Sequence, residues 1–341
     1  MAVLVTGATG FIGEHVVDLL LKEGLDVIGT TRSAEKAKKV HAQFKNNSKL
    51  SFEIVPELTA SDAFDNVFCE HGKRIQNVIH MASPFISGAT DFENQLLAPA
   101  RNGTIAIFNG IEKYGKNVKR VVFTSSLLTL ADSSKLSDEG SIFRERDWSS
   151  ATWETCQGDP MSAYGGSKKF AEKAAWEFVE SHKDKIGFKL AVVVPSMVLG
   201  PHKFEEDVKV NLNLSNRIID SLLNTSPNQT NLPKMCAPFI DVRDVARAHL
   251  VALRKESAVN QRICVFKRTF GSQDILDILN YRFPGLRGKI SLGPDPRKGD
   301  QTPSCNYDTS FSNKILGFEF KTLEESVCDT VAQVLNVRGD T

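Results

Sequence analysis

The sequence lacks the markers of several protein classes. Its six cysteines include no C-x-x-C pair, so they predict neither a zinc site nor a dense disulfide framework. No apolar run reaches the roughly 20 residues of a membrane span. The chain does not open on a basic segment followed by an apolar one, as a signal peptide does. We therefore expect a soluble protein of a reducing compartment, the cytoplasm, with no metal ion.

An excess of charge of either sign is also missing. The 42 Lys and Arg residues nearly balance the 41 Asp and Glu residues, which gives a formal net charge of +1. A nearly neutral chain has no general attraction for a polyanion, so a nucleic-acid partner is not expected. The 341 residues, 41% of them hydrophobic, suffice for one large or two modest domains.

Short β-branched runs alternate with amphipathic stretches in the first half of the chain. The runs include "AVLVTG", "DVIGTTR", "LSFEIVPEL", "NVIHMAS", "VKRVVFTSS" and "KLAVVVPSMVLG". This alternation predicts parallel βαβ units and a doubly wound, Rossmann-like α/β sheet. We expect residues 1–194 plus about 239–262 to form this domain. The more polar, proline-containing segments, about 195–238 and 263–341, predict a smaller substrate-binding domain.

A glycine-rich turn follows the first expected strand. The segment "TGATGFIG" places Gly7, Gly10 and Gly13 between that strand and an amphipathic helix. Such glycines allow a tight turn, close approach of the backbone to a pyrophosphate and close packing of helix against strand. Because the strand and the helix accompany the glycines, the motif predicts a bound dinucleotide.

The end of the second strand indicates which dinucleotide binds. NAD sites usually carry an acidic residue there to hold the ribose hydroxyls, whereas "GTTRSAEK" offers Arg32 and, one turn later, Lys36. A guanidinium can bind a phosphate through two hydrogen bonds, and a carboxylate in its place would repel the phosphate. The pattern favours NADPH over NADH.

Four polar residues predict a catalytic centre. Ser125 and Ser126 end the fifth strand, where ligands of doubly wound sheets bind, and the residues alone leave open which serine acts. Tyr164 and Lys168 in "MSAYGGSKKF" are four residues apart, hence on one face of a helix. A neighbouring ammonium is expected to lower the pKa of the phenol, about 10 in water, toward the range of a useful general acid.

Two adjacent glycines, Gly165 and Gly166, interrupt the same helix. Each costs about 1 kcal/mol relative to alanine in a helix interior, so a specific need for them is indicated. We expect them to leave room for the nicotinamide ribose.

Motifs along essentially the whole chain resemble one enzyme family. They are "VTGATGFIG", "GTTRSAEKA", "IHMASPF", "RVVFTSS", "AYGGSKKFAEKAAWEF", "FIDVRDVARAHL" and "ILGFEF". The chain resembles the extended short-chain dehydrogenase/reductases, within them the dihydroflavonol-reductase-like branch. It is most similar there to the fungal NADPH-dependent aldehyde and ketone reductases, which include methylglyoxal reductases. The resemblance implies an enzyme that reduces aldehydes and ketones by hydride transfer with a tyrosine as general acid. We expect a monomer or weak dimer with no membrane partner. Its substrates would include α-dicarbonyls such as methylglyoxal, bulky ketones and keto esters.

The resemblance also implies a role for each matching residue. Ser126, Tyr164 and Lys168 would form the catalytic triad, because the second serine of "TSS" is the catalytic one in the family. The cofactor would contact a longer set: Gly7, Gly10, Phe11, Ile12, Gly13, Arg32, Lys36, Glu57, Leu58, Ala82, Ser83, Lys168, Pro195 and Val198. The substrate pocket would be lined by Phe85, Leu127 and Met197.

At three of these positions the chain departs from its nearest relatives. Glu57 stands where an aspartate commonly meets the adenine, and Leu127 and Met197 stand where aromatic residues are usual. The loss of two aromatic rings predicts a roomier and more pliable pocket that tolerates bulky ketones.

Two alternative functions use the same fold. An NAD-linked sugar epimerase or hydroxysteroid dehydrogenase would be expected to carry an acid where Arg32 stands. A non-catalytic NADP-binding sensor would be expected to have lost Tyr164 or Lys168, and both are present.

Overall fold

A parallel sheet of seven strands forms the centre of the computed structural model, which describes residues 1–83, 88–132, 135–210, 212–232, 235–299 and 302–339. The strand order is β10-β7-β5-β4-β1-β2-β3, and every neighbouring pair is parallel. The predicted doubly wound sheet is therefore confirmed. The strands are β1 (Ala2–Thr6), β2 (Asp26–Thr31), β3 (Leu50–Ile54), β4 (Ile75–His80), β5 (Arg120–Thr124), β7 (Lys189–Pro195) and β10 (Arg262–Val265).

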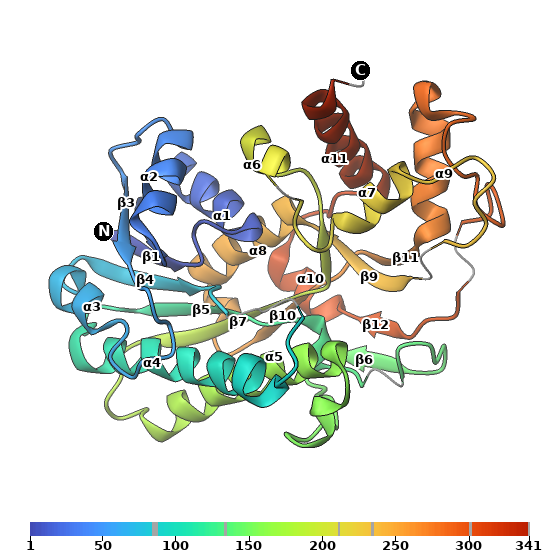
Figure 1. The fold of residues 1–341 in the computed structure, drawn as a ribbon. Coiled ribbons are helices and arrows are strands. Elements are labelled where there is room, and N and C mark those ends of the chain that lie inside the picture. Colours follow the sequence, from blue (N-terminus) through green and yellow to red (C-terminus); the bar gives the residue numbers. More distant parts are fainter. Residues whose placement is uncertain (84–87, 133–134, 211, 233–234, 300–301, 340–341) are drawn as a thin grey trace.

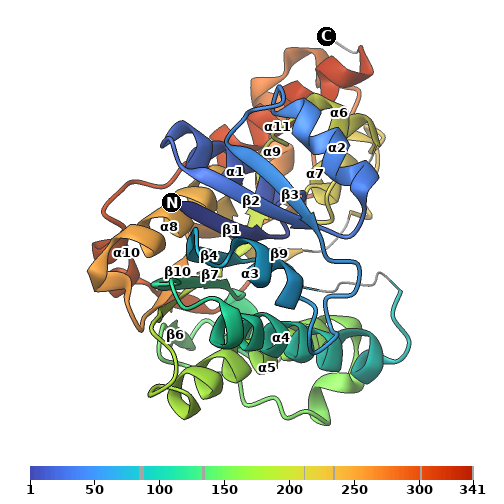
Figure 2. The same cartoon turned by 90° about the vertical axis from the view of Figure 1, so that its left-hand side faces the viewer.

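Helices cover both faces of this sheet (Figures 1 and 2). One face carries α3 (Asp65–His71), α4 (Ala98–Tyr114), preceded by a π-helical turn η1 (Glu93–Leu97), and α5 (Pro160–Ser181). The other carries α1 (Phe11–Lys22), α2 (Ala34–Gln43), α8 (Val242–Arg254) and α10 (Ser310–Leu316). Among the described residues, no helix combines the length and the apolar character that crossing a membrane requires.

Strand β5 illustrates why the sheet needs both layers. Val121 packs in a cluster with Phe108 of α4, while its neighbour Val122 packs in a second cluster with Val17 of α1. Successive side chains of a strand point to opposite faces, so an apolar strand requires cover on both sides. The polar groups of the site are consequently confined to the ends of the strands.

The remaining segments form a second group of elements beside the sheet. A smaller sheet contains β8 (Met197–Leu199), β9 (Cys236–Asp241) and β11 (Arg268–Gly271), and a third apolar cluster joins it to α7 (Arg217–Leu223), α9 (Ser272–Arg282) and α11 (Leu323–Arg338). Helix α6 (Glu205–Val210) packs Val208 against the same cluster. The paired strands β6 (Ile142–Arg144) and β12 (Asn306–Asp308) lie outside it. Short 3₁₀ turns are η2 (Leu127–Thr129), η4 (Thr155–Gly158), η5 (Glu256–Ala258) and η6 (Pro284–Leu286). The domain boundaries given above stay a prediction.

One expected strand is divided between the two sheets. The sequence predicts a single strand over "KLAVVVPSMVLG", but β7 ends at Pro195 and β8 begins at Met197. The Ser196 N–H still donates to the Val265 carbonyl of β10 (3.0 Å), and Met197 then pairs with Phe239 of β9. The single-strand expectation is therefore wrong, because the chain exchanges one partner strand for another at Ser196.

Helix α6 connects the second group to the helices beside the glycine turn. Asp207 of α6 accepts hydrogen bonds from Lys39 (2.6 Å) and Gln43 (3.2 Å) of α2, and it shares one with Glu14 of α1. Burial, followed by the negative charge of Asp207, raises the pKa of Glu14 to about 8. Glu14 therefore holds a proton near neutral pH and donates it in the bond to Asp207.

The raised pKa of Glu14 predicts a pH-dependent stability. Because the folded pKa lies above the ordinary value of 4.5, the stabilisation is complete below that value and is lost as the pH rises through about 8. The side chain introduced by Glu14→Gln does not titrate, so the unfolding free energy of this variant should not show this fall. Between pH 5 and pH 9 we expect the unmodified chain to lose a few kcal/mol more unfolding free energy than the variant, on the order of 1.4 kcal/mol per unit of pKa shift. Urea unfolding at both pH values measures the difference, and parallel pH curves for the two proteins would contradict the assignment.

Candidate active site

The glycine turn connects β1 to α1, as the sequence predicts. Gly7 has φ +69°, a conformation that favours glycine, and a Cβ on Gly13 would overlap the Gly7 carbonyl oxygen. Gly10 precedes α1 without a side-chain cap. The first N–H groups of a helix, here those of Phe11 and Ile12, have no partner inside the helix and attract anions. The turn therefore fits the diphosphate of a dinucleotide.

Thr6 ties the ends of β1 and β4 together where the strand order reverses. Its hydroxyl accepts the N–H groups of Met81 (3.1 Å) and Ala82 (3.0 Å) and lies 2.8 Å from His80 Nδ1. A hydroxyl that accepts twice has its one proton left to donate, so His80 Nδ1 is the acceptor. Burial lowers the pKa of His80 to about 3, which makes the ring neutral. Ala82 and Ser83 thus follow β4 beside the glycine turn.

Two exposed cations lie at the end of β2, the strand next to β1. Arg32 follows the strand directly, and Lys36 lies in the first turn of α2. The Ser33 hydroxyl caps this helix by accepting the Lys36 N–H (3.2 Å). This arrangement is compatible with a phosphate held beside the start of α2, the role expected for both residues.

Glu57 and Leu58 form the next loop along this edge of the sheet. The exposed Glu57 carboxylate accepts hydrogen bonds from the N–H (2.9 Å) and the hydroxyl (2.6 Å) of Thr59. These bonds lower the pKa of Glu57, with a smaller contribution from the charge of Arg32. Leu58 packs over Gly103 of α4, where a Cβ would lie 3.0 Å from Leu58 Cγ.

The serines after β5 have different environments. Ser125 is 3% exposed and donates its hydroxyl to Glu172 (2.5 Å). Ser126 is half-buried, begins the η2 turn and accepts the Leu128 N–H at 3.3 Å. The Ser125 hydroxyl is thus committed to the interior, while Ser126 retains some exposed surface.

Tyr164 and Lys168 lie on one face of the first turns of α5, with the Lys168 Nζ 6.0 Å from the Tyr164 ring centroid. Burial raises the pKa of Tyr164 and lowers that of Lys168 to about 8. The expectation that Lys168 lowers the phenol pKa is therefore wrong for this structure, because burial disfavours the charged form of each group. At neutral pH the phenol keeps its proton and the amine is mostly an ammonium.

The adjacent glycines of α5 face protein atoms. A Cβ on Gly166 would overlap Cys156 Sγ, and one on Gly165 would lie 3.5 Å from Leu128 Cβ. Cys156 itself is 1% exposed. The need for Gly166 is therefore close packing against Cys156, which corrects the expectation that it makes room for the nicotinamide ribose.

The residues expected around the nicotinamide and substrate are spread over several environments. Pro195 is buried at the end of β7, and Val198 is half-buried in β8. Met197 is half-buried against the third apolar cluster. Leu127 is 2% exposed and packs in the core beneath the sheet, so it offers almost no surface to a substrate, contrary to expectation. Phe85 lies outside the described residues.

A small cavity of about 250 Å³ lies beside the first turns of α5. It is lined in part by Leu128, Met161, Ser162 and Gly165. None of the described residues expected to line a substrate pocket borders it. Sequence reasoning missed Leu128, Met161 and Ser162 as cavity residues, because the other residues that line the cavity come from separate loops.

Several buried polar residues escaped the sequence analysis. Glu172, which follows Lys168 by four residues, accepts a hydrogen bond from the Ser125 hydroxyl and forms an ion pair with Arg262 at 2.7 Å. The Lys168–Glu172 spacing is the one signal that could have indicated it.

A separate cluster, partly exposed, consists of Glu53, Glu70 and His71. Each brings one possible ligand atom within 4.8 Å of the others, and His71 pairs with Glu53 at 2.8 Å.

Comparison with known proteins defines the class. The model of the NAD dependent epimerase/dehydratase family matches residues 3–265, and the chain belongs to this family. Among curated proteins, it is 48% identical over 341 residues to the NADPH-dependent methylglyoxal reductase of Saccharomyces cerevisiae, covering 99% of both chains.

Solved structures agree with this relationship. The yeast methylglyoxal/isovaleraldehyde reductase complexed with NADPH matches with a TM-score of 0.97 and 48% identity over 100% of both chains. A homologous NADPH complex from Candida albicans matches with a TM-score of 0.94 and 42% identity over 99% of both chains. The resemblance stated from the motifs is confirmed.

Two glycine variants separate the folding role of the turn from its binding role. Gly13→Ala places a methyl on the Gly7 carbonyl, so we expect a loss of about 3 kcal/mol or more in unfolding free energy. In Gly10→Ala the methyl lies 3.4 Å from the same oxygen, so we expect the unfolding free energy to fall by less than about 1 kcal/mol. NADPH binding should become at least about tenfold weaker, because the second glycine of the motif lets the backbone approach the pyrophosphate. Calorimetry of folding and of NADPH binding measures both quantities. Unaltered NADPH binding by Gly10→Ala would refute the assignment.

Lys168 predicts a pH limit to cofactor use. The pKa of Lys168 is about 8, so its ammonium loses a proton as the pH rises above that value. We therefore expect kcat/KM for NADPH, which reports the groups of the free enzyme, to fall above about pH 8. Lys168→Arg keeps its charge at high pH, so we expect this fall to move beyond pH 10. Rate profiles from pH 6 to pH 10 check it; the same alkaline limb in both proteins would assign the limb to another group.

Proposed function

We propose that this chain reduces aldehydes and ketones to alcohols with NADPH. The observation that carries the proposal is the 48% identity, over its full length, to a methylglyoxal reductase that uses NADPH. The chain keeps Ser126, Tyr164 and Lys168 on elements that meet at the carboxyl edge of the sheet. A non-catalytic sensor would not need this combination.

The residues around the glycine turn would hold the cofactor. The turn itself and the N-terminus of α1 would bind the diphosphate, and Arg32 with Lys36 would bind the 2′-phosphate. Glu57 and Leu58 would lie near the adenine, Ala82 and Ser83 along the cofactor, and Pro195 and Val198 beside the nicotinamide. Bound NADPH supplies the hydride that reduces the carbonyl carbon.

The polar triad supplies the proton and orients the carbonyl. The Tyr164 phenol, protonated at neutral pH, donates its proton to the carbonyl oxygen as negative charge develops there. Ser126 donates a hydrogen bond to the same oxygen. Lys168 would hold the nicotinamide ribose of the cofactor and would take part in returning a proton to Tyr164.

Carbonyl compounds of several sizes are proposed as substrates. Methylglyoxal and 3-methylbutanal correspond to the substrates in the names of the relatives. Met197, an unbranched side chain in place of an aromatic ring, favours acceptance of bulky ketones and keto esters.

All six cysteines are free, which supports a reducing compartment such as the cytoplasm. A monomer or weak dimer stays a prediction.

The function is tested by following NADPH absorbance with methylglyoxal, 3-methylbutanal, a β-keto ester and an aryl ketone. We expect turnover of the first two at least, and a clear preference for NADPH over NADH. An absence of NADPH oxidation with every carbonyl would contradict the proposal.

Two variants control this experiment. Tyr164→Phe removes the proton donor and should lower kcat by about 100-fold or more without weakening NADPH binding more than a few-fold. Arg32→Ala should raise KM for NADPH by about tenfold or more and leave KM for NADH nearly unchanged, because NADH has no 2′-phosphate. Equal effects on both cofactors would remove Arg32 from the proposed phosphate site.

A further inference from the structure

A buried ion pair connects α5, the helix that carries Tyr164 and Lys168, to the start of β10. Glu172 of α5 is 0% exposed and Arg262 of β10 is 8% exposed. Arg262 Nε donates to Glu172 Oε1 at 2.7 Å and Nη2 donates to Oε2 at 3.2 Å. The two residues are 90 positions apart in the chain, so only the fold brings them together.

Every hydrogen-bonding position of the pair has a partner. The remaining donors of Arg262 reach the carbonyls of Glu145 (2.8 Å) and Asp147 (2.6 Å) and the Thr129 hydroxyl (2.6 Å). Glu172 also accepts the Trp176 indole N–H at 3.1 Å and the Ser125 hydroxyl at 2.5 Å. A fully satisfied buried network of this kind holds its members in one arrangement.

Two branches of the network end at Ser126. In the first, Glu172 holds the hydroxyl of the preceding residue, Ser125. In the second, the Thr129 hydroxyl accepts from Arg262 and donates to the Ser126 carbonyl at 2.8 Å. The backbone of Ser126 is thus held on both sides by groups bonded to the ion pair.

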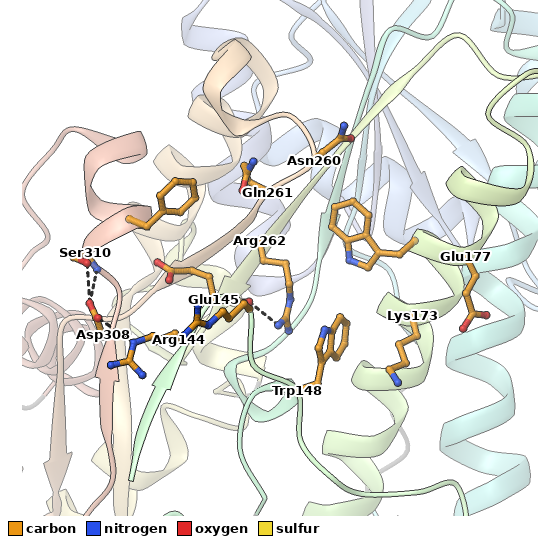
Figure 3. A pocket seen from close by; sticks show the side chains of 13 residues that line it. Arg144, Glu145, Trp148, Lys173, Glu177, Asn260, Gln261, Arg262, Asp308 and Ser310 are labelled. Carbon is orange, nitrogen blue, oxygen red and sulfur yellow. Dashed lines mark hydrogen bonds and ion pairs between the residues drawn. The ribbon is translucent and has the colours of Figure 1, made fainter. Parts of the chain in front are cut away.

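The same pair is fixed relative to the tyrosine and the lysine. Tyr164, Lys168 and Glu172 follow one another at intervals of four residues along α5, so they lie along one face of the helix. The guanidinium carbon of Arg262 lies 3.9 Å from the centroid of the Trp148 ring. Figure 3 shows Arg262 and Trp148 among the side chains that line a pocket of about 780 Å³, with the bond from Arg262 to Glu145.

We propose that Glu172 and Arg262 are positioning residues, which hold the hydroxyl of Ser126 at a fixed place relative to Tyr164. The inference rests on the proposed function, because it assigns Ser126 a hydrogen bond to the substrate carbonyl. Oxyanion stabilisation depends on donors that are already oriented when charge develops, so a small displacement of Ser126 lowers the rate. The network acts on kcat through Ser126, and none of the residues described as its members is among those expected to contact the cofactor.

Two variants disconnect Ser126 and leave both bonds between Glu172 and Arg262 in place, although Thr129→Val also removes one acceptor of Arg262. Ser125→Ala removes the first branch, and Thr129→Val removes the second with little change in shape. We expect each to lower kcat by about tenfold, with KM for NADPH changed less than twofold. Trp176→Phe is the matched control, since it removes a donor from Glu172 on the side away from Ser126; we expect a loss of Tm comparable to that of Ser125→Ala, with kcat within about twofold.

A double-mutant cycle with Ser126→Ala distinguishes positioning from general loosening. We expect Ser126→Ala to lower kcat by about 100-fold, and Ser125→Ala or Thr129→Val to lower it less than about twofold further in that background. The same factor in both backgrounds, an unchanged kcat in the single variants, or an equal loss of kcat in Trp176→Phe would overturn the inference. A wild-type chain that reduces no carbonyl would instead overturn the proposed function.

Discussion

Burial of the central sheet on both faces is the constraint on which the rest of the molecule depends. Strand residues such as Val121 and Val122 alternate between two apolar clusters, so the interior offers no place for a polar ligand. Loops that can carry chemistry are left at the carboxyl ends of the strands. The glycine turn after β1, Ala82 after β4 and Ser126 after β5 share that edge, and the site is a consequence of the layer architecture.

Several buried polar groups that lie just inside this edge are paired with one another, and their pairing shapes the site. Thr6 satisfies two N–H groups and His80, and Glu172 holds Ser125. Burial also determines the charges: it keeps the proton on Tyr164 and brings the pKa of Lys168 to about 8. A protonated phenol and an ammonium at neutral pH are the two protonation states that the proposed roles of Tyr164 and Lys168 require.

The sequence predicted the features that depend on local patterns. Alternating apolar runs indicated the doubly wound sheet, and the spacing of Gly7, Gly10 and Gly13 located the turn, because strand and helix periods and left-handed turns are encoded within a few residues. It failed where distant segments decide. The need for Gly166 comes from Cys156 in the preceding η4 turn, and the burial of Leu127 comes from the core around it. The protonation of Glu14 comes first from its burial and then from the charge of Asp207. No pattern within a few residues of these positions indicates such distant partners.

The most direct test of this account is the fate of the transferred hydrogen. The chain would be incubated with NADPH deuterated at the transferable position of the nicotinamide and with 3-methylbutanal, and the alcohol analysed by mass spectrometry and NMR. The account predicts one deuterium on the former carbonyl carbon and a solvent-derived proton on the oxygen, with product formation strongly reduced in Tyr164→Phe. An alcohol without deuterium, or a Tyr164→Phe variant as fast as the unmodified chain, would contradict it.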